Sequence, residues 1–273
     1  MVEILKAIVL GIIEGITEWL PISSTGHMIL VDEFLKLGMS DAFKEMFFVV
    51  IQLGAIMAVV VLYWNKIFPF SFDKKPFVKK NIIIMWIKIV IACIPAAVIG
   101  LAFDDEINAL FYNFQTVAIM LIVFGILFIV VENYNKGRRP KVSDMDNLTY
   151  KMAIIIGLFQ LIAAIFPGTS RSGATILGAL LIGVSREVAA EFTFFLAIPV
   201  MFGASLLKLV KFGFAFTSYE LLVLGVGMVV AFLVSVWSIK FLVGYIKKHD
   251  FKPFGYYRIV LGIILLGYFF FIK

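Results

Sequence analysis

Long apolar runs alternate with short polar stretches along this chain. Six of the runs contain few charged residues and are long enough to cross a membrane: about 43–65, 82–104, 116–135, 186–211, 219–242 and 255–272. An α-helix rises 1.5 Å per residue, so about 20 apolar residues cover the roughly 30 Å hydrocarbon core of a bilayer. The pattern therefore predicts six membrane-spanning helices.

Two further apolar stretches are broken in the middle. Residues 1–38 are interrupted by PISSTGH at 21–27, and residues 147–184 by PGTSRSG at 167–173. Pro21 and Pro167 have no amide proton to donate and end the helices that precede them. Irregular backbone at membrane depth is tolerated only where protein buries it or water reaches it. Each stretch is therefore predicted to be a re-entrant helix pair whose tip lies inside the protein.

The composition excludes the soluble classes. Hydrophobic residues make up 62% of the 273 residues and charged residues only 15%, whereas about 25% is usual for charged residues in soluble domains. The single cysteine, Cys93, cannot form an intrachain disulfide or supply a zinc site. The chain is predicted to be an all-α polytopic membrane protein with a single transmembrane domain, residues 1–273.

The basic residues indicate an orientation. A net charge of +6 would favour nucleic acid in a soluble protein, but here basic residues cluster in loops, which is the pattern that orients membrane proteins. No nucleic acid partner is expected. If both re-entrant pairs return to the side they entered from, the three basic loops share the cytoplasmic side and both termini lie outside. Lys208 and Lys211, beside an outer loop, depart from this pattern. The basic loops carry Lys66, Lys74, Lys75, Lys79 and Lys80; Lys136, Arg138, Arg139, Lys141 and Lys151; and Lys240, Lys247, Lys248 and Lys252.

The two halves of the chain resemble each other. Each half, about 1–135 and 147–273, contains one re-entrant pair and three spanning helices. Three is an odd number, so the second half is predicted to be inverted relative to the first, and inverted repeats with broken helices are typical of transporters. A shift of 146 residues aligns Gly11 with Gly157, Glu14 with Gln160, Pro21 with Pro167, Ser23 with Thr169, Ser24 with Ser170 and Glu45 with Glu191.

Glu14 and Glu18 are functional candidates because ionisable groups inside a bilayer are costly. Two like charges four residues apart on a helix repel each other. The pair therefore needs a cation, a shared proton or a water-lined cavity. Carboxylate oxygens are ligands that Mg²⁺ and Ca²⁺ prefer, and such a cation would bridge to phosphate oxygens. Glu14 and Glu18 are the candidate metal ligands for a divalent cation.

Both breaks contain residues suited to phosphate chemistry. Ser24 and His27 supply a potential nucleophile and a potential base on one helical turn. Arg171 carries a planar fork that suits phosphate or carboxylate. If the repeat places the two breaks together, two helix N-termini face one anion site. This inventory favours phosphate-ester or diphosphate hydrolysis over acyl transfer. The neighbouring polar residues are Ser23, Thr25, Thr169, Ser170 and Ser172.

EGITEWLPISSTGH at 14–27 and PGTSRSG at 167–173 resemble the two signature regions of the bacterial undecaprenyl-diphosphate phosphatase family, which is associated with bacitracin resistance. The resemblance extends over the chain and includes VVIQLGAI at 49–56. It implies hydrolysis of undecaprenyl diphosphate to undecaprenyl phosphate and inorganic phosphate, which recycles the lipid carrier for cell-wall synthesis. It also implies a site on the outer side of the bacterial cell (inner) membrane and a homodimer.

The resemblance assigns roles to individual residues. Glu14 and Glu18 match the acidic pair, Ser24 the proposed nucleophile, His27 the motif histidine and Arg171 the phosphate-clamping arginine. The residues that line the same two segments, and so are candidates to bind phosphate, are Ser23, Thr25, Thr169, Ser170 and Ser172.

Two questions stay open at this point. Ser24 is the preferred nucleophile, with His27 or a carboxylate taking its proton. In the competing version His27 is the nucleophile, or a carboxylate activates water directly. The rival function is a transporter or flippase of a polyprenyl-phosphate lipid, because an inverted repeat with an anion site also suits that task.

Overall fold

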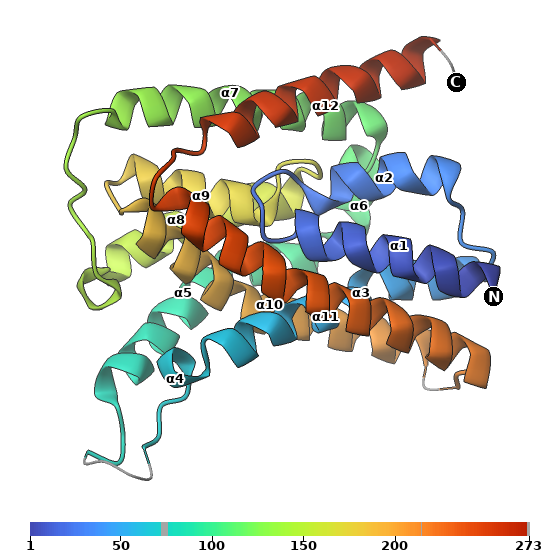
Figure 1. The fold of residues 1–273 in the computed structure, drawn as a ribbon, viewed down its shortest axis with the longest axis horizontal. Coiled ribbons are helices and arrows are strands. Elements are labelled where there is room, and N and C mark those ends of the chain that lie inside the picture. The colour runs from blue at the N-terminus through green and yellow to red at the C-terminus, as the bar shows by residue number, and fades with distance from the viewer. Residues whose placement is uncertain (72–75, 214, 272–273) are drawn as a thin grey trace.

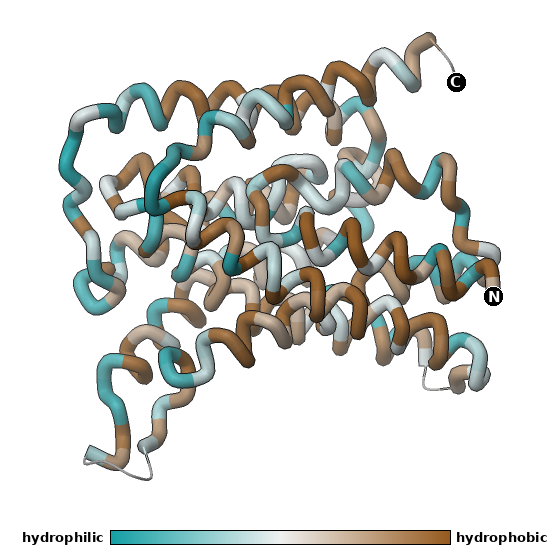
Figure 2. The backbone as a smooth tube through the Cα atoms, in the orientation of Figure 1, coloured by the Kyte–Doolittle hydropathy of each residue, from teal (hydrophilic) through white to brown (hydrophobic). Residues whose placement is uncertain are grey.

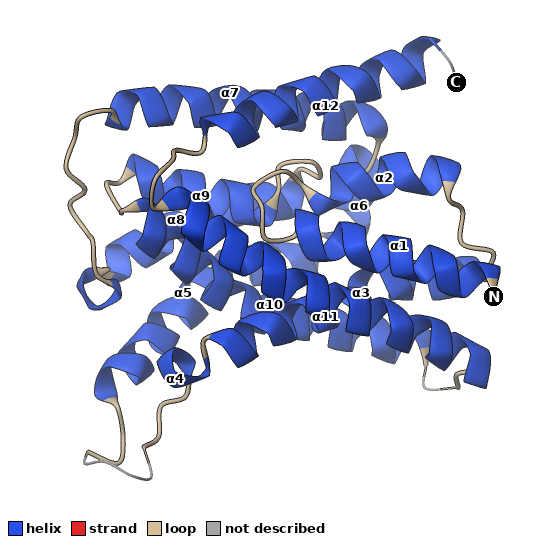
Figure 3. Ribbon diagram, in the orientation of Figure 1, coloured by secondary structure: helices blue, strands red, loops and turns tan. Residues whose placement is uncertain are grey.

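The computed structural model describes residues 1–71, 76–213 and 215–271, and its elements are helices (Figures 1 and 3). Within those ranges the only β-type contacts are two isolated bridges, Phe70–Val78 and Val142–Val184. The helices are α1 (Val2–Thr17), α2 (Ser24–Phe34), α3 (Asp41–Leu62), α4 (Trp64–Ile67), α5 (Lys80–Ala102), α6 (Asp104–Phe111), α7 (Phe114–Asn135), α8 (Tyr150–Ile165), α9 (Arg171–Leu181), α10 (Arg186–Phe212), α11 (Ser218–Ile246) and α12 (Lys252–Phe271), with a 3₁₀ turn at Met145–Asn147.

Six of these helices, α3, α5, α7, α10, α11 and α12, are long and apolar enough to cross a membrane. The predicted all-α polytopic membrane protein is thereby confirmed. Several spans begin a little before the predicted apolar run, because polar side chains cap their first turns. Ser40 accepts the Phe43 amide at 3.2 Å, Asn113 accepts the Thr116 amide at 2.9 Å, and Thr217 accepts the Glu220 amide at 3.2 Å. The short helices α4 and α6 lie in connections and were not predicted.

Each broken stretch forms a pair of short helices, as the sequence predicts. The first pair is α1 and α2, and the second is α8 and α9. Pro21 at the first tip and Gly168 and Thr169 at the second are buried. Gly168 has φ +89°, and a Cβ there would overlap the backbone of Val117. The second tip is therefore packed directly against α7 and requires glycine at this position.

The charged loops gather at one end of the helix bundle. In Figure 1 the connections α4–α5, α7–α8 and α11–α12 all lie at the left, whereas both termini lie at the right. This is the arrangement predicted if both re-entrant pairs return to the side they entered from. In Figure 2 the α7–α8 and α11–α12 connections are largely hydrophilic, whereas the described part of the α4–α5 connection is mixed. Lys74 and Lys75 lie outside the described residues. Lys208, on the opposite end, forms an ion pair with Glu45, so its charge is balanced within the protein.

Corresponding contacts recur in the two halves. Helices α3 and α10 pack together. At one end Glu45 of α3 forms an ion pair with Lys208 of α10. At the other end Lys66, in the short helix α4 that follows α3, lies 2.9 Å from Glu191 of α10. Helix α1 packs on α11, and α8 packs on α5. These matched pairs agree with the alignment of Glu45 with Glu191. The inverted relation of the halves stays a prediction that they support.

Candidate active site

The two helix-pair tips share one unusual backbone conformation. Ser23, with φ 75°, caps α2 and accepts the Gly26 amide at 3.3 Å. Ser170, with φ 69°, caps α9 and accepts the Gly173 amide at 3.1 Å. A non-glycine residue at positive φ is strained and persists only where the surroundings hold it. The two caps thus correspond structurally, one residue out of register with the predicted alignment of Ser23 with Thr169.

Polar contacts join the two tips. The Ser172 hydroxyl donates to the backbone carbonyls of Glu18 at 3.1 Å and Leu20 at 3.4 Å. These bonds bring the first turn of α9 onto the end of α1. The prediction that the two breaks come together is therefore confirmed for these residues.

Arg258 in α12 joins the same two tips and was not predicted from the sequence. It is fully buried and donates to the carbonyls of Pro21 at 3.1 Å, Gly168 at 3.0 Å and Thr169 at 2.7 Å. One arginine therefore holds the backbone of both tips. The available signal was a single arginine inside the otherwise apolar run 255–272, where ionisable groups are functional candidates.

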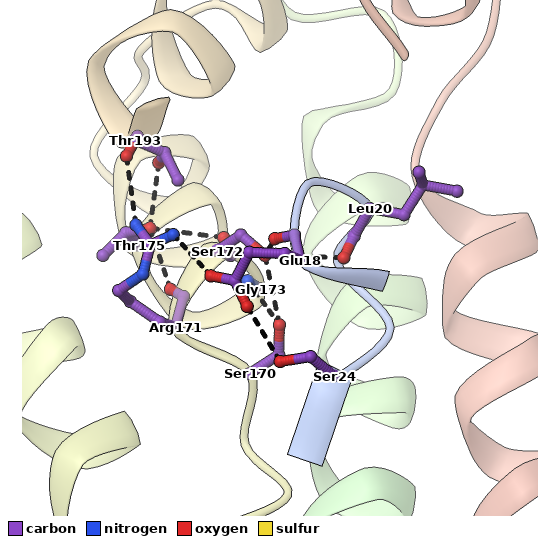
Figure 4. A network of polar contacts seen from close by, with 9 residues as sticks. All are labelled: Glu18, Leu20, Ser24, Ser170, Arg171, Ser172, Gly173, Thr175 and Thr193. Atoms are coloured by element: carbon purple, nitrogen blue, oxygen red, sulfur yellow. Dashed lines mark hydrogen bonds and ion pairs between the residues drawn. The ribbon is translucent and has the colours of Figure 1, made fainter. Parts of the chain in front are cut away.

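Glu18 is the centre of the polar network (Figure 4). Its Oε1 lies 2.7 Å from Arg171 Nη2, and its Oε2 accepts a hydrogen bond from the Ser24 hydroxyl at 2.8 Å. Arg171 Nη1 also donates to the Thr193 carbonyl at 3.2 Å. The side chains of Arg171 and Glu18 are only 14% and 8% exposed, so their attraction is weakly screened. Three of the five predicted catalytic residues thus form one cluster.

His27 lies beside this cluster with different partners. Its Nδ1 is 2.7 Å from the Ser23 carbonyl oxygen, and its Nε2 is 2.6 Å from the Tyr257 hydroxyl. A carbonyl oxygen only accepts, so Nδ1 carries the proton and Nε2 of the neutral ring accepts from Tyr257. The Ser24 hydroxyl donates to Glu18 instead. Of the two bases considered for Ser24, the carboxylate is the one in contact.

Glu14 completes the acidic pair. It is 1% exposed, and its Oε1 has no hydrogen-bond partner within the described ranges. Nowhere in that part of the chain do three His, Cys, Asp or Glu side chains gather as a metal cluster. Mg²⁺ is commonly held by one or two carboxylates, with substrate phosphate and water as the other ligands. The unpartnered Glu14 oxygen, one helical turn from Glu18, is therefore a suitable ligand for a cation that also binds a phosphate substrate.

The other predicted phosphate-binding residues differ in their placement. The Ser170 and Ser172 hydroxyls are 3.2 Å apart within the network. Thr25 is half-buried, and among the described residues its side chain makes no hydrogen bond. Thr169 is fully buried, and its hydroxyl likewise lacks a partner there.

Thr175 and Thr193 were not predicted. Their hydroxyls are 2.9 Å apart, and Thr175 donates to the Arg171 carbonyl at 2.9 Å. They support the turn that carries Arg171.

A hydroxyl, a carboxylate and a guanidinium meet at the N-termini of α2 and α9 within a bundle of membrane-spanning helices. Positive helix ends and arginine stabilise phosphate oxygens, and phosphoryl transfer depends on such positioning and electrostatics. Fold and site together define a polytopic membrane protein whose buried polar cluster contains the kinds of group that phosphoryl transfer requires. The chain belongs to the bacitracin resistance protein BacA family, whose sequence model matches residues 7–264.

Curated relatives match nearly the whole chain. The undecaprenyl-diphosphatase of Desulfitobacterium hafniense is 74% identical over 98% of this chain and 97% of its own length. Undecaprenyl-diphosphatase 1 of Clostridium acetobutylicum is 66% identical over 98% of both chains. An undecaprenyl-diphosphatase of Enterococcus faecalis is 64% identical over 97% of this chain and 96% of its own.

Proposed function

We propose that this protein is a membrane phosphatase that hydrolyses undecaprenyl diphosphate to undecaprenyl phosphate and inorganic phosphate. The observation that carries the proposal is the cluster of Ser24, Glu18 and Arg171 at the joined helix tips. Relatives with nearly complete coverage bear the name of this activity. A binding protein would need the arginine and the helix ends, but not a hydroxyl already bonded to a carboxylate.

The contacts favour a serine nucleophile with a carboxylate base. Ser24 Oγ attacks the terminal phosphorus while its proton passes to Glu18, 2.8 Å away. The bond from this phosphorus to the bridging oxygen breaks, and undecaprenyl phosphate leaves with the electron pair. Glu18 passes the Ser24 proton to the departing undecaprenyl phosphate and is again a carboxylate. Water then attacks the phosphoserine and gives a proton to Glu18. The bond from phosphorus to Ser24 Oγ breaks, Glu18 returns this proton to Oγ, and inorganic phosphate departs.

The other residues would assist this reaction. Arg171 exchanges its Glu18 contact for phosphate oxygens and, with the N-termini of α2 and α9, stabilises charge on the transferring group. His27, hydrogen-bonded to Tyr257, would orient the lipid phosphate. Glu14 and Glu18 would hold a divalent cation, Mg²⁺ or Ca²⁺, which neutralises charge on phosphate oxygens when bound.

The setting of the reaction is part of the proposal. We place the protein in the bacterial cell membrane, the inner one where there are two, with the basic loops on the cytoplasmic side. The active site would face outward, as the family resemblance implies. Undecaprenyl phosphate released there re-enters cell-wall synthesis. Removal of undecaprenyl diphosphate would confer bacitracin resistance. A homodimer stays a prediction that rests on the family resemblance.

Purified protein in detergent is expected to release phosphate from a long-chain polyprenyl diphosphate. We expect release to require Mg²⁺ or Ca²⁺ and to fall to background with a chelator, because Glu14 offers an unpaired carboxylate oxygen. Measuring inorganic phosphate with each cation and with chelator checks both points. Folded protein that releases no phosphate under any condition would instead favour the transporter or flippase of a polyprenyl-phosphate lipid.

Ser24→Ala is expected to lower the turnover rate at least about 100-fold, because it removes the hydroxyl that attacks phosphorus and that Glu18 deprotonates. Ser238→Ala is the matched control, since that hydroxyl only donates to the Val234 carbonyl of its own helix at 3.0 Å. Near-normal turnover of the Ser24 variant would rule out the serine nucleophile and leave His27 or activated water.

A further inference from the structure

A polar cavity, separate from the active-site cluster, lies at the end of the bundle that carries the basic loops. Its volume is about 440 Å³, and it is bordered by the ends of α7, α9, α10 and α11 and by the loop after α7. Five cationic side chains line it against two carboxylates. The cations are Arg138, Arg139, Lys141, Arg186 and Lys247, and the carboxylates are Glu132 and Glu187.

One carboxylate is already neutralised inside the protein. Glu132 is 2% exposed and accepts from Arg186 Nε at 2.9 Å and Nη2 at 2.5 Å, and also from the Phe251 amide at 2.9 Å. This pair leaves four cations facing Glu187. Arg138 stacks on Tyr134, with its guanidinium carbon 3.8 Å from the ring centroid. Within the described ranges, Arg139, Lys141 and Lys247 have no carboxylate partner, so the cavity has an excess of positive charge.

The cationic loop is held in place before any ligand arrives. The Gly183 carbonyl accepts the amides of Lys141 at 2.7 Å and Val142 at 3.2 Å, and the Ser185 amide donates to the Val142 carbonyl at 2.8 Å. Gly183 has φ +89°, and a Cβ there would lie 3.1 Å from the Lys141 side chain. The loop therefore rests directly on the α9–α10 turn, and little ordering is needed when an anion binds.

The walls of the cavity indicate what the anion is attached to. Leu180, Leu181, Ile182 and Ile246 line the same space. Leu181 is 44% exposed and Tyr134 is 55% exposed, and tyrosine is enriched at the membrane interface. A ligand seated here meets basic groups on one side and apolar surface on the other. Basic pockets between spanning helices at the cytoplasmic side bind anionic lipid headgroups.

We infer that this cavity is a binding site for the phosphate of an anionic membrane phospholipid. The phosphate would lie among Arg139, Lys141 and Lys247, and the acyl chains would leave along Leu181 and Tyr134. The lipid would link the α7–α8 loop to the ends of α9 and α11 and so stabilise this end of the bundle.

The full-length protein in a neutral detergent tests this inference. Thermal unfolding is followed during titration with phosphatidylglycerol, phosphatidylcholine or inorganic phosphate, and native mass spectrometry counts retained lipid. We expect phosphatidylglycerol to raise the Tm and to be retained, whereas the other two leave the Tm unchanged. Equal effects of phosphatidylglycerol and phosphatidylcholine, or of inorganic phosphate, would overturn an anionic lipid as the ligand.

A pair of charge-matched variants separates the cavity from general attraction to a basic surface. Arg139→Gln combined with Lys141→Gln is expected to raise at least about tenfold the phosphatidylglycerol concentration that gives half of the full Tm increase, called the midpoint below. Each basic group near the headgroups contributes a factor of about five to lipid affinity. Lys151→Gln combined with Lys240→Gln removes two exposed charges outside the cavity and is expected to keep the wild-type midpoint. Equal shifts in the two double variants would contradict the site. Both should retain phosphate release, which shows that they are folded.

Discussion

Arg171→Ala is expected to lower phosphate release from polyprenyl diphosphate about 10³-fold, the loss seen when a donor that stabilises transition-state charge is removed. The guanidinium lies 2.7 Å from Glu18 at the N-terminus of α9, where the phosphoryl oxygens would bind. Arg171→Lys keeps a charge but not the planar fork, so its activity is expected to lie between those of wild type and alanine variant. Steady-state kinetics in detergent measures both. An alanine variant that retains a tenth of the wild-type rate would contradict this role.

Arg171→Ala also removes the positive charge that pairs with the Glu18 carboxylate, and an unpaired buried charge is strongly destabilising. Adding Glu18→Gln to Arg171→Ala should therefore restore thermal stability without restoring activity. Recovery of both together would mean that Arg171 acts only on the fold, and recovery of neither would mean that the Arg171–Glu18 ion pair is not what the alanine variant lost.

Arg258→Met is expected to reduce both thermal stability and phosphate release. The substitution fills much of the same space but removes the donors from the carbonyls of Pro21, Gly168 and Thr169. Each buried carbonyl left without a partner costs about 1–3 kcal/mol, so a loss of about 3 kcal/mol or more is expected. The Tm in detergent and the turnover of the fraction that stays folded measure the two effects.

Two variants make this test specific. Lys151→Met removes an exposed cation and should leave both quantities unchanged. Arg258→Lys keeps a charge and some donors and should recover part of the stability. An Arg258→Met protein with wild-type Tm and turnover would show that the two tips hold together without this residue.

The sequence was sufficient for the architecture because its main features are local. Apolar runs of spanning length, and the prolines at 21 and 167, each predict a helix or its end without reference to any distant residue. The candidates Glu18, Ser24 and Arg171 could be named for a similar reason: charged and hydroxyl groups are conspicuous in apolar segments. The structure adds that Glu18 contacts both of the others.

The partners of these residues could not be predicted, because they depend on packing between distant segments. His27 contacts Tyr257, 230 residues away, and Arg258 reaches both tips only after α12 packs against α7. The alignment of the two tips was also wrong by one residue, because it pairs Ser23 with Thr169 whereas the structure makes Ser170 the counterpart of Ser23. Both serines have positive φ, which the alignment of Pro21 with Pro167 does not reveal.

The ion pair between Arg171 and Glu18 bears on how the reaction ends. An incoming phosphate must displace the Glu18 carboxylate from Arg171. The net free energy of phosphate binding is therefore the difference between the new Arg171–phosphate contact and the lost Arg171–Glu18 ion pair. The isoprenoid chain of the substrate adds binding free energy of its own, whereas free orthophosphate has no further group that contacts the protein. Orthophosphate is thus expected to be a weak competitive inhibitor, and the returning Glu18 carboxylate speeds its departure. The enzyme would remain active in surroundings rich in its own small product.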